Sequence, residues 1–368
     1  MKIMHLLPSL SSGGVEQVVL ELCQGLSDRG EKCVVVSAGG PMVDLVEAAG
    51  ARHICRPIDK KSLLQLVQAW KMTRLLREER PDILHVHSRV PAWIARIALC
   101  MLRAAERPIL VSSFHGFHSV NVYSQVMTRG SAVIAVSRSM KEHILTHYPA
   151  TPPERVHVIP NSVDLESCHP GFVPSAEWLT RWQQEHPELT KKFTLCLAGR
   201  ITRLKGCVHL VPILAGLHRL GVPAHAVIVG ETKRGKEKLR QELEETFSAA
   251  GLAEHTTWLG HRRDLREVLA VCSVTLSLTL QPESFGKVSL EALALGRPVA
   301  GYAHGGVGEQ LEQFLPEGMI PVGDTDAMVA RLAEWYRTPP VLKKPVGSPY
   351  RREDMIQAHL ELYHQLIS

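Results

Sequence analysis

Short β-rich runs alternate with helical patterns along the whole chain, and this alternation constrains the fold more than any other feature. In the first half, helical patterns at Val15–Arg29, Met42–Ala49, Ser62–Glu79 and Ala92–Arg103 separate the runs KIMHLL, KCVVVS, RHIC, DILHVHS and PILVSS. In the second half, Cys207–Leu220, Gly235–Ala250 and Asp264–Val271 separate FTLCLAG, AHAVIVG, TTWLG and VTLSL. Strands and helices that alternate at this spacing form parallel sheets with helices on both faces. The sequence therefore predicts two doubly wound α/β domains.

A turn-rich connector separates the two halves. The segment Val156–Pro170 ends a strand and then runs through turn residues, which is typical of a hinge. We place the first domain at residues 1–165 and the second at residues 166–349. A proline-rich segment, TPPVLKKPVGSP, then leads to a last helix at Arg351–Ile367, within residues 350–368.

Composition limits the function classes. The net charge of +5 fits anionic small molecules or a membrane surface, and it falls short of the charge of a nucleic-acid-binding domain. The eight cysteines show no CxxC pair and no Cys/His cluster at metal-ligand spacing, so we expect buried, reduced thiols. The N-terminal run KIMHLL is too short for a signal peptide. We expect a cytoplasmic protein that binds no nucleic acid.

The predicted helix at Ser62–Arg80 carries a basic, amphipathic face. Its cationic and apolar positions recur at helical spacing: Lys71, Arg74 and Arg77 beside Leu63, Leu66, Val67 and Trp70. Such a face can lie on anionic lipid at the inner side of the cytoplasmic membrane. The alternative is a solvated cationic face on an ordinary packing helix.

The stretch ESFGKVSLE, from Glu283 to Glu291, follows an apolar strand pattern and opens a helix. A strand, a tight turn and a helix N-terminus meet here, and free backbone N–H groups at a helix N-terminus attract anions. In an open α/β sheet, ligands bind at the edge where the strands end. Both glutamates are therefore expected to border a ligand site. The alternative is an ordinary turn with one capping and one exposed glutamate.

Two other strand-to-helix turns carry ligand-binding signals. In LAGRITRLKG, Arg200 and Lys205 suit a diphosphate, because a guanidinium and an ammonium both donate charge-assisted hydrogen bonds to phosphate oxygens. Gly13 and Gly14 follow the first strand and permit a ligand to approach the backbone closely. The pair lacks the glycine spacing of a nicotinamide-binding fingerprint.

His115 follows the strand run PILVSS and could donate a hydrogen bond to a sugar hydroxyl or a phosphate. His304 lies after another strand run and could also border the site. Asp324 and Asp326 directly precede a helical run, so we interpret Asp324-Thr325-Asp326 as a helix N-cap, not as metal ligands. We expect no metal and no cofactor.

These motifs, taken in order, resemble those of the retaining nucleotide-sugar glycosyltransferases of family four, including bacterial cell-envelope and lipopolysaccharide enzymes. The similar segments are GGVE, FHG, AVSRSM, IPNSVD, GRITRLKG, VGE, LGHRRD and ESFGKVSLEALALGRPV. The resemblance covers nearly the whole chain and implies the GT-B fold, in which two Rossmann-like domains face each other across a cleft. It also implies that the last helix packs back on the first domain. Ser162 and Lys287 depart from the family pattern, which more often has a glycine and an apolar residue there.

The resemblance implies a role for each motif residue. Arg200 and Lys205 would bind the donor diphosphate, Glu291 the ribose, and Glu283 the donor sugar. The remaining positions implied in the site are the backbone of Phe285, Gly286 and Lys287, Gly13 and Gly14 at the donor, and His115 beside the transferred sugar. We count His115, Glu283, Arg200 and Lys205 as the catalytic set.

The expected function is a metal-independent, retaining transfer of a hexose-type sugar from a UDP- or GDP-linked donor to a hydroxyl of a cell-envelope glycan. A lipopolysaccharide core and a lipid-linked oligosaccharide are the candidate acceptors. The resemblance implies retention by front-face attack, in which the leaving diphosphate helps to deprotonate the acceptor. The sequence shows no second carboxylate clearly placed as a covalent nucleophile. Two alternatives are a GT-B nucleotide-sugar epimerase and a non-catalytic nucleotide-sugar-binding subunit.

Overall fold

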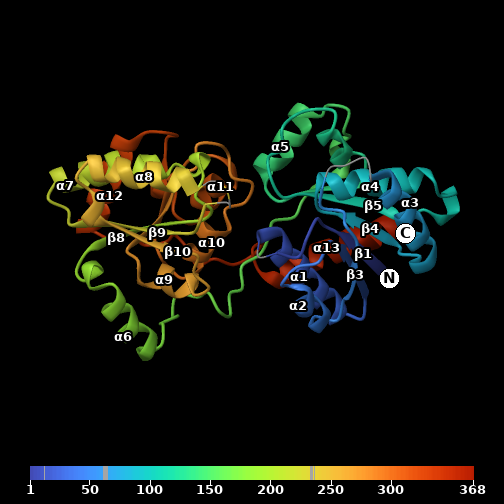
Figure 1. Ribbon diagram of the computed structural model, residues 1–368, viewed down its shortest axis with the longest axis horizontal. Helices are drawn as coiled ribbons and strands as arrows, with labels where there is room; N and C mark the ends of the chain where they lie inside the picture. Colours follow the sequence, from blue (N-terminus) through green and yellow to red (C-terminus); the bar gives the residue numbers. More distant parts are fainter. Residues whose placement is uncertain (12, 61–64, 233–234, 236) are drawn as a thin grey trace. The chain divides into compact units, whose positions relative to one another are not determined.

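The computed structural model describes residues 1–11, 13–60, 65–232, 235 and 237–368. It divides into two compact units. Unit 1 contains Met1–Ser162 and Ser348–Ser368, and unit 2 contains Val163–Gly347. Each unit is a parallel sheet with helices on both faces, so the predicted α/β fold with two doubly wound domains is confirmed (Figure 1).

Among the described residues, unit 1 has a seven-stranded sheet in the order β3-β2-β1-β4-β5-β6-β7. Its strands are β1 (Lys2–Leu6), β2 (Lys32–Ser37), β3 (Arg52–Cys55), β4 (Ile83–Val86), β5 (Ile109–Phe114), β6 (Ala132–Ala135) and β7 (Val156–Val158). Its helices are α1 (Gly14–Ser27), α2 (Val43–Ala48), α3 (Gln65–Glu79), α4 (Arg89–Cys100), α5 (Arg138–His147) and α13 (Arg352–Ile367). Three short 3₁₀ turns connect them: Ala104–Glu106, Ser124–Thr128 and Pro153–Arg155.

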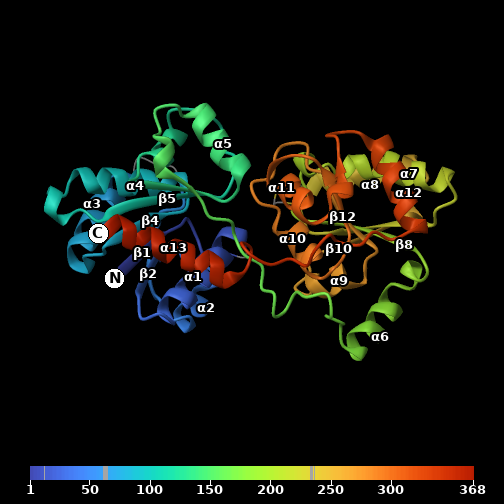
Figure 2. The same cartoon turned by 180° about the vertical axis from the view of Figure 1, so that it is seen from behind.

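Two hydrophobic clusters hold the helices of unit 1 against the sheet. One contains apolar side chains of α3, α4 and α5, and the other contains those of α1, α2 and α13. Figures 1 and 2 show these two sets of helices on opposite faces of the sheet. The last helix packs beside α1, and its Met355, Ile356, Leu362 and Tyr363 belong to the second cluster. The C-terminal segment is therefore part of the core of unit 1.

Unit 2 has a six-stranded sheet among its described residues, in the order β10-β9-β8-β11-β12-β13. Its strands are β8 (Phe193–Ala198), β9 (Ala224–Val229), β10 (Thr256–Gly260), β11 (Val274–Ser277), β12 (Val299–Tyr302) and β13 (Met319–Ile320). Its helices are α6 (Ala176–Glu185), α7 (Leu210–Arg219), α8 (Glu237–Ala249), α9 (Leu265–Val271), α10 (Lys287–Ala294), α11 (Gly305–Phe314) and α12 (Thr325–Arg337). Its 3₁₀ turns are Pro187–Leu189, Arg203–Lys205, Cys207–His209, Ala253–His255 and Pro316–Gly318.

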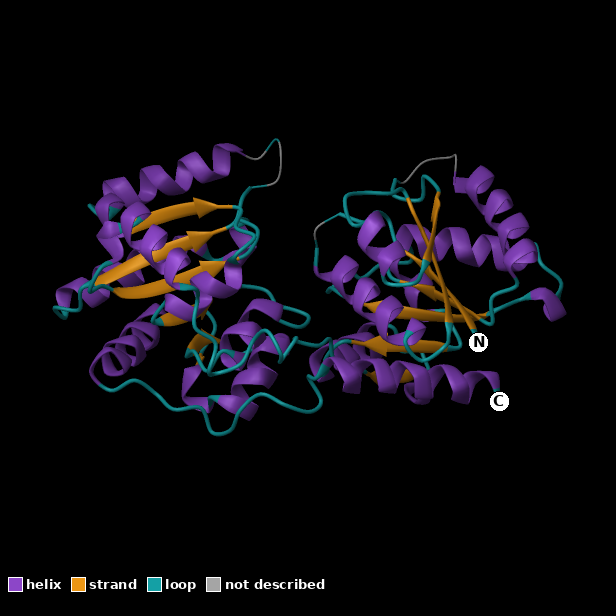
Figure 3. Cartoon of the chain, turned by 90° about the horizontal axis from the view of Figure 1, so that it is seen from below, coloured by secondary structure: helices purple, strands orange, loops and turns teal. Residues whose placement is uncertain are grey.

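The strand order reverses between β8 and β11 in unit 2, and between β1 and β4 in unit 1. The loops that leave two such strands diverge to opposite faces of the sheet, and the space between them is where α/β proteins bind ligands. Figure 3 shows the strands and the helices that cover them. The sheet of each unit thus places one candidate site at the carboxyl ends of its central strands.

Several local predictions can be compared with the structure. Asp324 caps α12, since its Oδ1 accepts a hydrogen bond from the backbone N–H of Ala327 at 2.9 Å, and the N-cap interpretation is confirmed. The predicted helix start at Ser62, together with Leu63, lies outside the described residues.

Ser162, at the predicted hinge, donates a hydrogen bond to the buried Glu21 carboxylate at 2.6 Å, so its hydroxyl has a structural use that a glycine would lack. No described helix is long and apolar enough to cross a membrane.

Unit 1 buries a group of histidines between the sheet and helices α1 and α13. His85 Nδ1 lies 2.7 Å from the Tyr363 hydroxyl, and His85 Nε2 lies 2.7 Å from the Ser113 hydroxyl. Burial lowers the pKa of His85 and of His87 well below the usual value, and neighbouring imidazoles lower both pKa values further. Burial also lowers the pKa of His359 to about 4. These side chains are therefore neutral in the folded protein at neutral pH.

The lowered histidine pKa values predict a loss of stability in acid. The folded state binds fewer protons than the unfolded state, in which histidine titrates near its ordinary value. The stabilisation is therefore complete above pH ~6.5 and falls as the pH drops toward the folded-state pKa, by about 1 kcal/mol per pH unit for each histidine. Replacing His359 with Gln removes one such group, so the free energy of unfolding of H359Q should depend less steeply on pH.

The measurement is urea unfolding between pH 7.5 and 5, followed by hydrogen exchange in peptides from β1 and β4. The control is H147Q, which changes an exposed histidine of the same unit and should keep the wild-type pH dependence. Equal pH dependence in H359Q and the wild type would contradict the assignment of His359 as a buried neutral group.

Candidate active site

A cavity lies at the carboxyl ends of β8 and β11 in unit 2. Its volume is about 210 Å³. It is lined by the ends of both strands and the loops that follow them: Leu197, Ala198, Gly199, Arg200, Lys205, Leu276, Ser277, Leu278, Thr279, Glu283, Gly286, Lys287, Val288 and Ser289. This is the point where the strand order reverses, so the cavity occupies the position at which such sheets bind ligands.

Two of the predicted residues form an ion pair in this cavity. Lys205 Nζ lies 2.7 Å from Glu283 Oε1, and both side chains are about 70% buried. The Thr279 hydroxyl donates to the other Glu283 oxygen at 3.3 Å. Arg200 lines the same wall on an exposed backbone segment after Gly199. The structure thus brings Arg200, Lys205 and Glu283 together from turns far apart in the sequence.

Helix α10 points its N-terminus at the cavity. Its first three residues, Lys287, Val288 and Ser289, all line it, and Gly286 forms the N-cap. The first N–H groups of a helix have no partner within the helix, and the helix dipole is positive at this end. Lys287 adds a third cationic side chain. Three cations and one carboxylate therefore surround the cavity, which leaves a net charge of about +2 for an anionic ligand.

The loop between β11 and α10 is held by the start of α11. The Gly306 N–H donates to the Glu283 carbonyl at 2.8 Å, and Gln310 Nε2 donates to the Phe285 carbonyl at 2.7 Å. A Cβ atom on Gly306 would lie 2.5 Å from the Phe285 carbonyl oxygen, so only glycine permits this approach. His304 Nε2 lies 2.7 Å from the Thr279 carbonyl oxygen. These contacts fix the backbone on which Glu283 stands.

His304 was expected only to border the site, and Gln310 and Thr279 were not predicted at all. In the sequence, the only signal that α11 supports the loop between β11 and α10 was the HGG triplet after the strand at Val299–Tyr302. Gln310 lies four residues after that triplet on α11, and its role is recognised only through the packing of α11 on the loop.

Glu291 and Phe285 do not line the cavity directly. Glu291 stands on α10 one turn beyond Lys287, on the same side of the helix, and is half-buried. Burial raises the pKa of Cys168, and the negative charge of Glu291 raises that pKa further. The Phe285 side chain is buried, so only its backbone is available to a ligand.

The other predicted residues belong to unit 1. Gly13 is the N-cap of α1, and Gly14 is its first residue. His115 follows β5 and lies half-buried beside His87, with 3.0 Å between His115 Nε2 and His87 Nδ1. Burial lowers the pKa of His115 to about 3, and the positive forms of His359 and His118 lower it as well. His115 is therefore a neutral imidazole at neutral pH, able to donate or accept a hydrogen bond but not to carry charge.

Comparison with known families agrees with this arrangement. The model described as "Glycosyltransferase Family 4" matches residues 12–167, and the model described as "Glycosyl transferases group 1" matches residues 180–352. The two matches follow each other along almost the whole chain. The chain belongs to the glycosyltransferases of family four type that are built from these two domains.

Individual relatives differ in what they act on. The alpha-maltose-1-phosphate synthase of Mycolicibacterium smegmatis is 30% identical over 62% of this chain, which spans only 59% of that relative. The 2-deoxystreptamine N-acetyl-D-glucosaminyltransferase of Streptomyces fradiae is 26% identical over 86% of this chain and 80% of its own length. Among solved structures, Anabaena HepE in complex with UDP and glucose aligns over 99% of this chain and 100% of its own, with a TM-score of 0.84 and 21% identity. This last likeness confirms the fold of two Rossmann-like domains.

The turn after β8 yields a prediction about Gly206. This residue has φ = 68°, and a Cβ atom on it would lie 1.9 Å from the Leu278 carbonyl oxygen. Gly206→Ala should therefore push the Lys205 turn away from the β11 loop and destabilise unit 2 by several kcal/mol, well beyond the ~1 kcal/mol of a left-handed alanine alone. The measurement is the free energy of urea unfolding of unit 2.

Gly221→Ala is the matched control. Gly221 has φ = 74°, but a Cβ atom there meets nothing within 4 Å. The Gly221→Ala variant should lose only the unfolding free energy, about 1 kcal/mol, that a left-handed alanine backbone costs. Equal losses in the two variants would mean that the close approach of Gly206 to Leu278 has no energetic weight.

Proposed function

We propose that this family-four-type glycosyltransferase transfers a hexose-type sugar from a nucleoside-diphosphate sugar to a hydroxyl of a cell-envelope glycan. The observation that carries the proposal is the Lys205–Glu283 ion pair beside Arg200 and the N-terminus of α10. A nucleoside-diphosphate sugar combines a dianion with a ring of hydroxyl groups, and this wall offers partners for both. UDP or GDP is the expected nucleotide.

The diphosphate binds through charge. Its two negative charges match the net charge of about +2 that Arg200, Lys205, Lys287 and Glu283 leave around the cavity. A partly exposed ion pair such as Lys205–Glu283 contributes at most about 1 kcal/mol. Charge-assisted hydrogen bonds to a phosphate contribute roughly 1.5–3 kcal/mol each. The diphosphate therefore competes successfully for the Lys205 ammonium.

Release of Lys205 makes Glu283 available to the sugar. A carboxylate accepts hydrogen bonds from two adjacent hydroxyl groups, and the Thr279 hydroxyl and the Gly306 N–H hold its side chain and its backbone in place. As the bond from the sugar to the diphosphate breaks, negative charge grows on the leaving oxygen. The same cations and the α10 N–H groups stabilise that charge, which lowers the barrier.

The nucleoside diphosphate leaves and the acceptor hydroxyl attacks on the same face of the sugar. No second carboxylate among the residues that line the cavity stands ready as a nucleophile, so we propose retention by front-face attack, with the leaving diphosphate accepting the acceptor proton. Arg200 and Lys205 offset the leaving-group charge without a metal. His115, neutral at physiological pH, donates or accepts a hydrogen bond at a sugar or acceptor hydroxyl. We also propose that Glu291 binds the ribose and that Gly13 and Gly14 contact the donor.

A donor panel tests the function. Purified protein with UDP- and GDP-sugars should release free nucleoside diphosphate only when a cell-envelope glycolipid extract is present, and added Mg²⁺ should leave the rate unchanged. Conversion of the donor sugar without nucleotide release would replace this proposal with an epimerase. Donor binding with neither reaction would replace it with a binding subunit.

Within that assay, Lys205→Ala should lower kcat/KM by roughly ten- to a hundredfold, at about 1.4 kcal/mol for each tenfold. The matched control is Arg203→Ala. Arg203 belongs to the same 3₁₀ turn, but its side chain pairs with Glu242 and is about three-quarters exposed, outside the cavity. R203A should keep near wild-type rates. A K205A enzyme as fast as R203A would refute the diphosphate role.

We also propose that α3 rests on an anionic membrane surface at the inner side of the cytoplasmic membrane, where a glycolipid acceptor would lie. Leu66, Val67 and Trp70 expose about half or more of their surface, and the Arg74 guanidinium lies over the Trp70 ring at 5.5 Å. Exposed apolar side chains flanked by cations favour the interface of an anionic bilayer.

Trp70→Ser should reduce co-sedimentation with vesicles that contain phosphatidylglycerol, and should have little effect with neutral vesicles. Leu220→Ser is the control, because Leu220 is an equally exposed apolar side chain of unit 2. Equal binding by W70S and the wild type would show that α3 is an ordinary packing helix with a solvated cationic face.

A further inference from the structure

Two thiols and an imidazole meet at one point inside unit 1. None of the three residues takes part in the proposed transfer, and His5 reaches His115 only through His87. Cys23 comes from α1, Cys33 from the start of β2, and His5 from β1. The two sulfur atoms and one ring nitrogen of His5 all lie within 4.8 Å of one another. All three residues are at least 96% buried. The sequence shows no metal-binding spacing here, because the three elements meet only in the fold.

The His5 ring lies beside the Cys33 thiol and has one buried nitrogen without a well-formed hydrogen bond. Its Nδ1 is used by His87 Nε2, at 3.1 Å. Its Nε2 is buried and makes no well-formed hydrogen bond. Leaving a buried polar atom unsatisfied costs about 1–3 kcal/mol. Since Nδ1 is taken, Nε2 is the nitrogen left for a ligand shared with the sulfur atoms.

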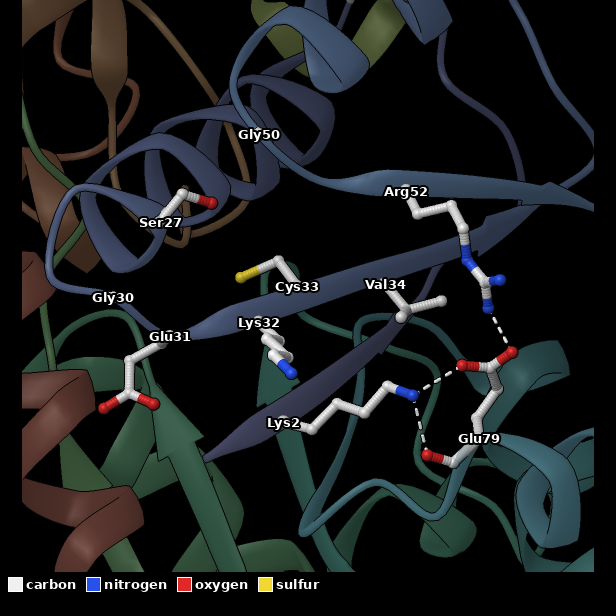
Figure 4. Close-up of a pocket in the computed structure, with 10 residues that line it drawn as sticks. All are labelled: Lys2, Ser27, Gly30, Glu31, Lys32, Cys33, Val34, Gly50, Arg52 and Glu79. Atoms are coloured by element: carbon white, nitrogen blue, oxygen red, sulfur yellow. Dashed lines mark hydrogen bonds and ion pairs between the residues drawn. The ribbon is translucent and has the colours of Figure 1, made fainter.

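A surface pocket of about 450 Å³ at the amino ends of β1 and β2 reaches one member of the cluster, Cys33 (Figure 4). Cys33 and Ser27 line it, and Figure 4 shows the Cys33 sulfur and the Ser27 hydroxyl on the same side of the pocket. The Ser27 oxygen is also buried without a well-formed hydrogen bond. The side chains of His5 and Ser27 therefore both lie beside the Cys33 thiol, and each has a polar atom without a well-formed hydrogen bond.

We propose that His5, Cys23 and Cys33 bind one thiophilic d¹⁰ cation, with Zn²⁺ as the expected ion. Zn–S bonds of about 2.3 Å and Zn–N bonds of about 2.0 Å place tetrahedral ligand atoms about 3.5–3.8 Å apart, which the cluster reaches with shifts of about 1 Å or less. The Ser27 hydroxyl, or water that enters through the pocket, completes the tetrahedron. Binding releases the two thiol protons to solvent and cross-links α1, β1 and β2.

A second histidine group does not fit a metal. His5, His85 and His87 also approach one another, but His85 already uses both ring nitrogens for Tyr363 and Ser113. His87 uses both of its own for His5 and His115. These nitrogens are satisfied by hydrogen bonds. The cluster with the two thiols is the one in which a nitrogen is left over.

Titration of the reduced full-length protein with Co²⁺, a spectroscopic substitute for Zn²⁺, tests the site. We expect one equivalent to give tetrahedral d–d bands and thiolate-to-cobalt charge-transfer absorption, and Zn²⁺ to abolish both. Cys33→Ser should weaken binding at least tenfold. Cys196→Ser is the control, because Cys196 and Cys272 form a buried thiol pair in unit 2 that belongs to no such cluster among the described residues.

A measurement without variants covers the case in which C33S fails to fold. Zn²⁺ should slow alkylation of Cys23 and Cys33 at least tenfold in the wild-type protein, with no effect on the exposed thiols of Cys55 and Cys100. The absence of thiolate-to-cobalt absorption in fully reduced protein would overturn the proposal. So would equal Co²⁺ affinity in folded C33S, or Zn²⁺-independent alkylation of Cys23 and Cys33.

Discussion

The adjacency of β8 and β11 is the constraint on which unit 2 depends. The two strands are neighbours in the sheet, with Val274 paired to Leu195 and Thr275 to Cys196, although almost eighty residues separate them in the chain. Because they are parallel, both end at the same edge, and the turn with Lys205 meets the turn with Glu283 there. Everything else at the cavity follows from this register. A slip by one residue would turn the side chains of β11 to the opposite face of the sheet and move Glu283 away from Lys205.

Much of the fold, and the position of the candidate site on the second sheet, could be predicted from the sequence, because hydrophobic periodicity and turn residues are local signals. The alternating runs indicated two parallel sheets, and the motifs around Arg200, Lys205 and Glu283 indicated the correct edge of the second sheet. The helix expected at Val15–Arg29 is observed at Gly14–Ser27, a shift within the usual fraying of helix ends. Asp324 was interpreted correctly as a cap, since an N-cap is decided by residues three positions apart.

What the sequence could not supply are contacts between distant segments. The Lys205–Glu283 ion pair, the support of Phe285 by Gln310, and the meeting of His5, Cys23 and Cys33 all require the register of the sheet. The position of Glu291 relative to the cavity also depends on the fold, since it lies on α10 two residues beyond Ser289, the last residue of that helix that lines the cavity. For His115, sequence position suggested a site residue, but only burial among other imidazoles reveals that it is neutral.

The ion pair between Lys205 and Glu283 has a consequence for turnover. In the reaction proposed above, the sugar bound by Glu283 would have moved to the acceptor after transfer, while the nucleoside diphosphate would still occupy Lys205. The freed carboxylate lies within reach of the same ammonium and acts as an intramolecular competitor for it. Under that proposal, Glu283 would replace each departing nucleotide at Lys205. This exchange would weaken product inhibition without weakening the hold on the intact donor, whose sugar would keep Glu283 occupied.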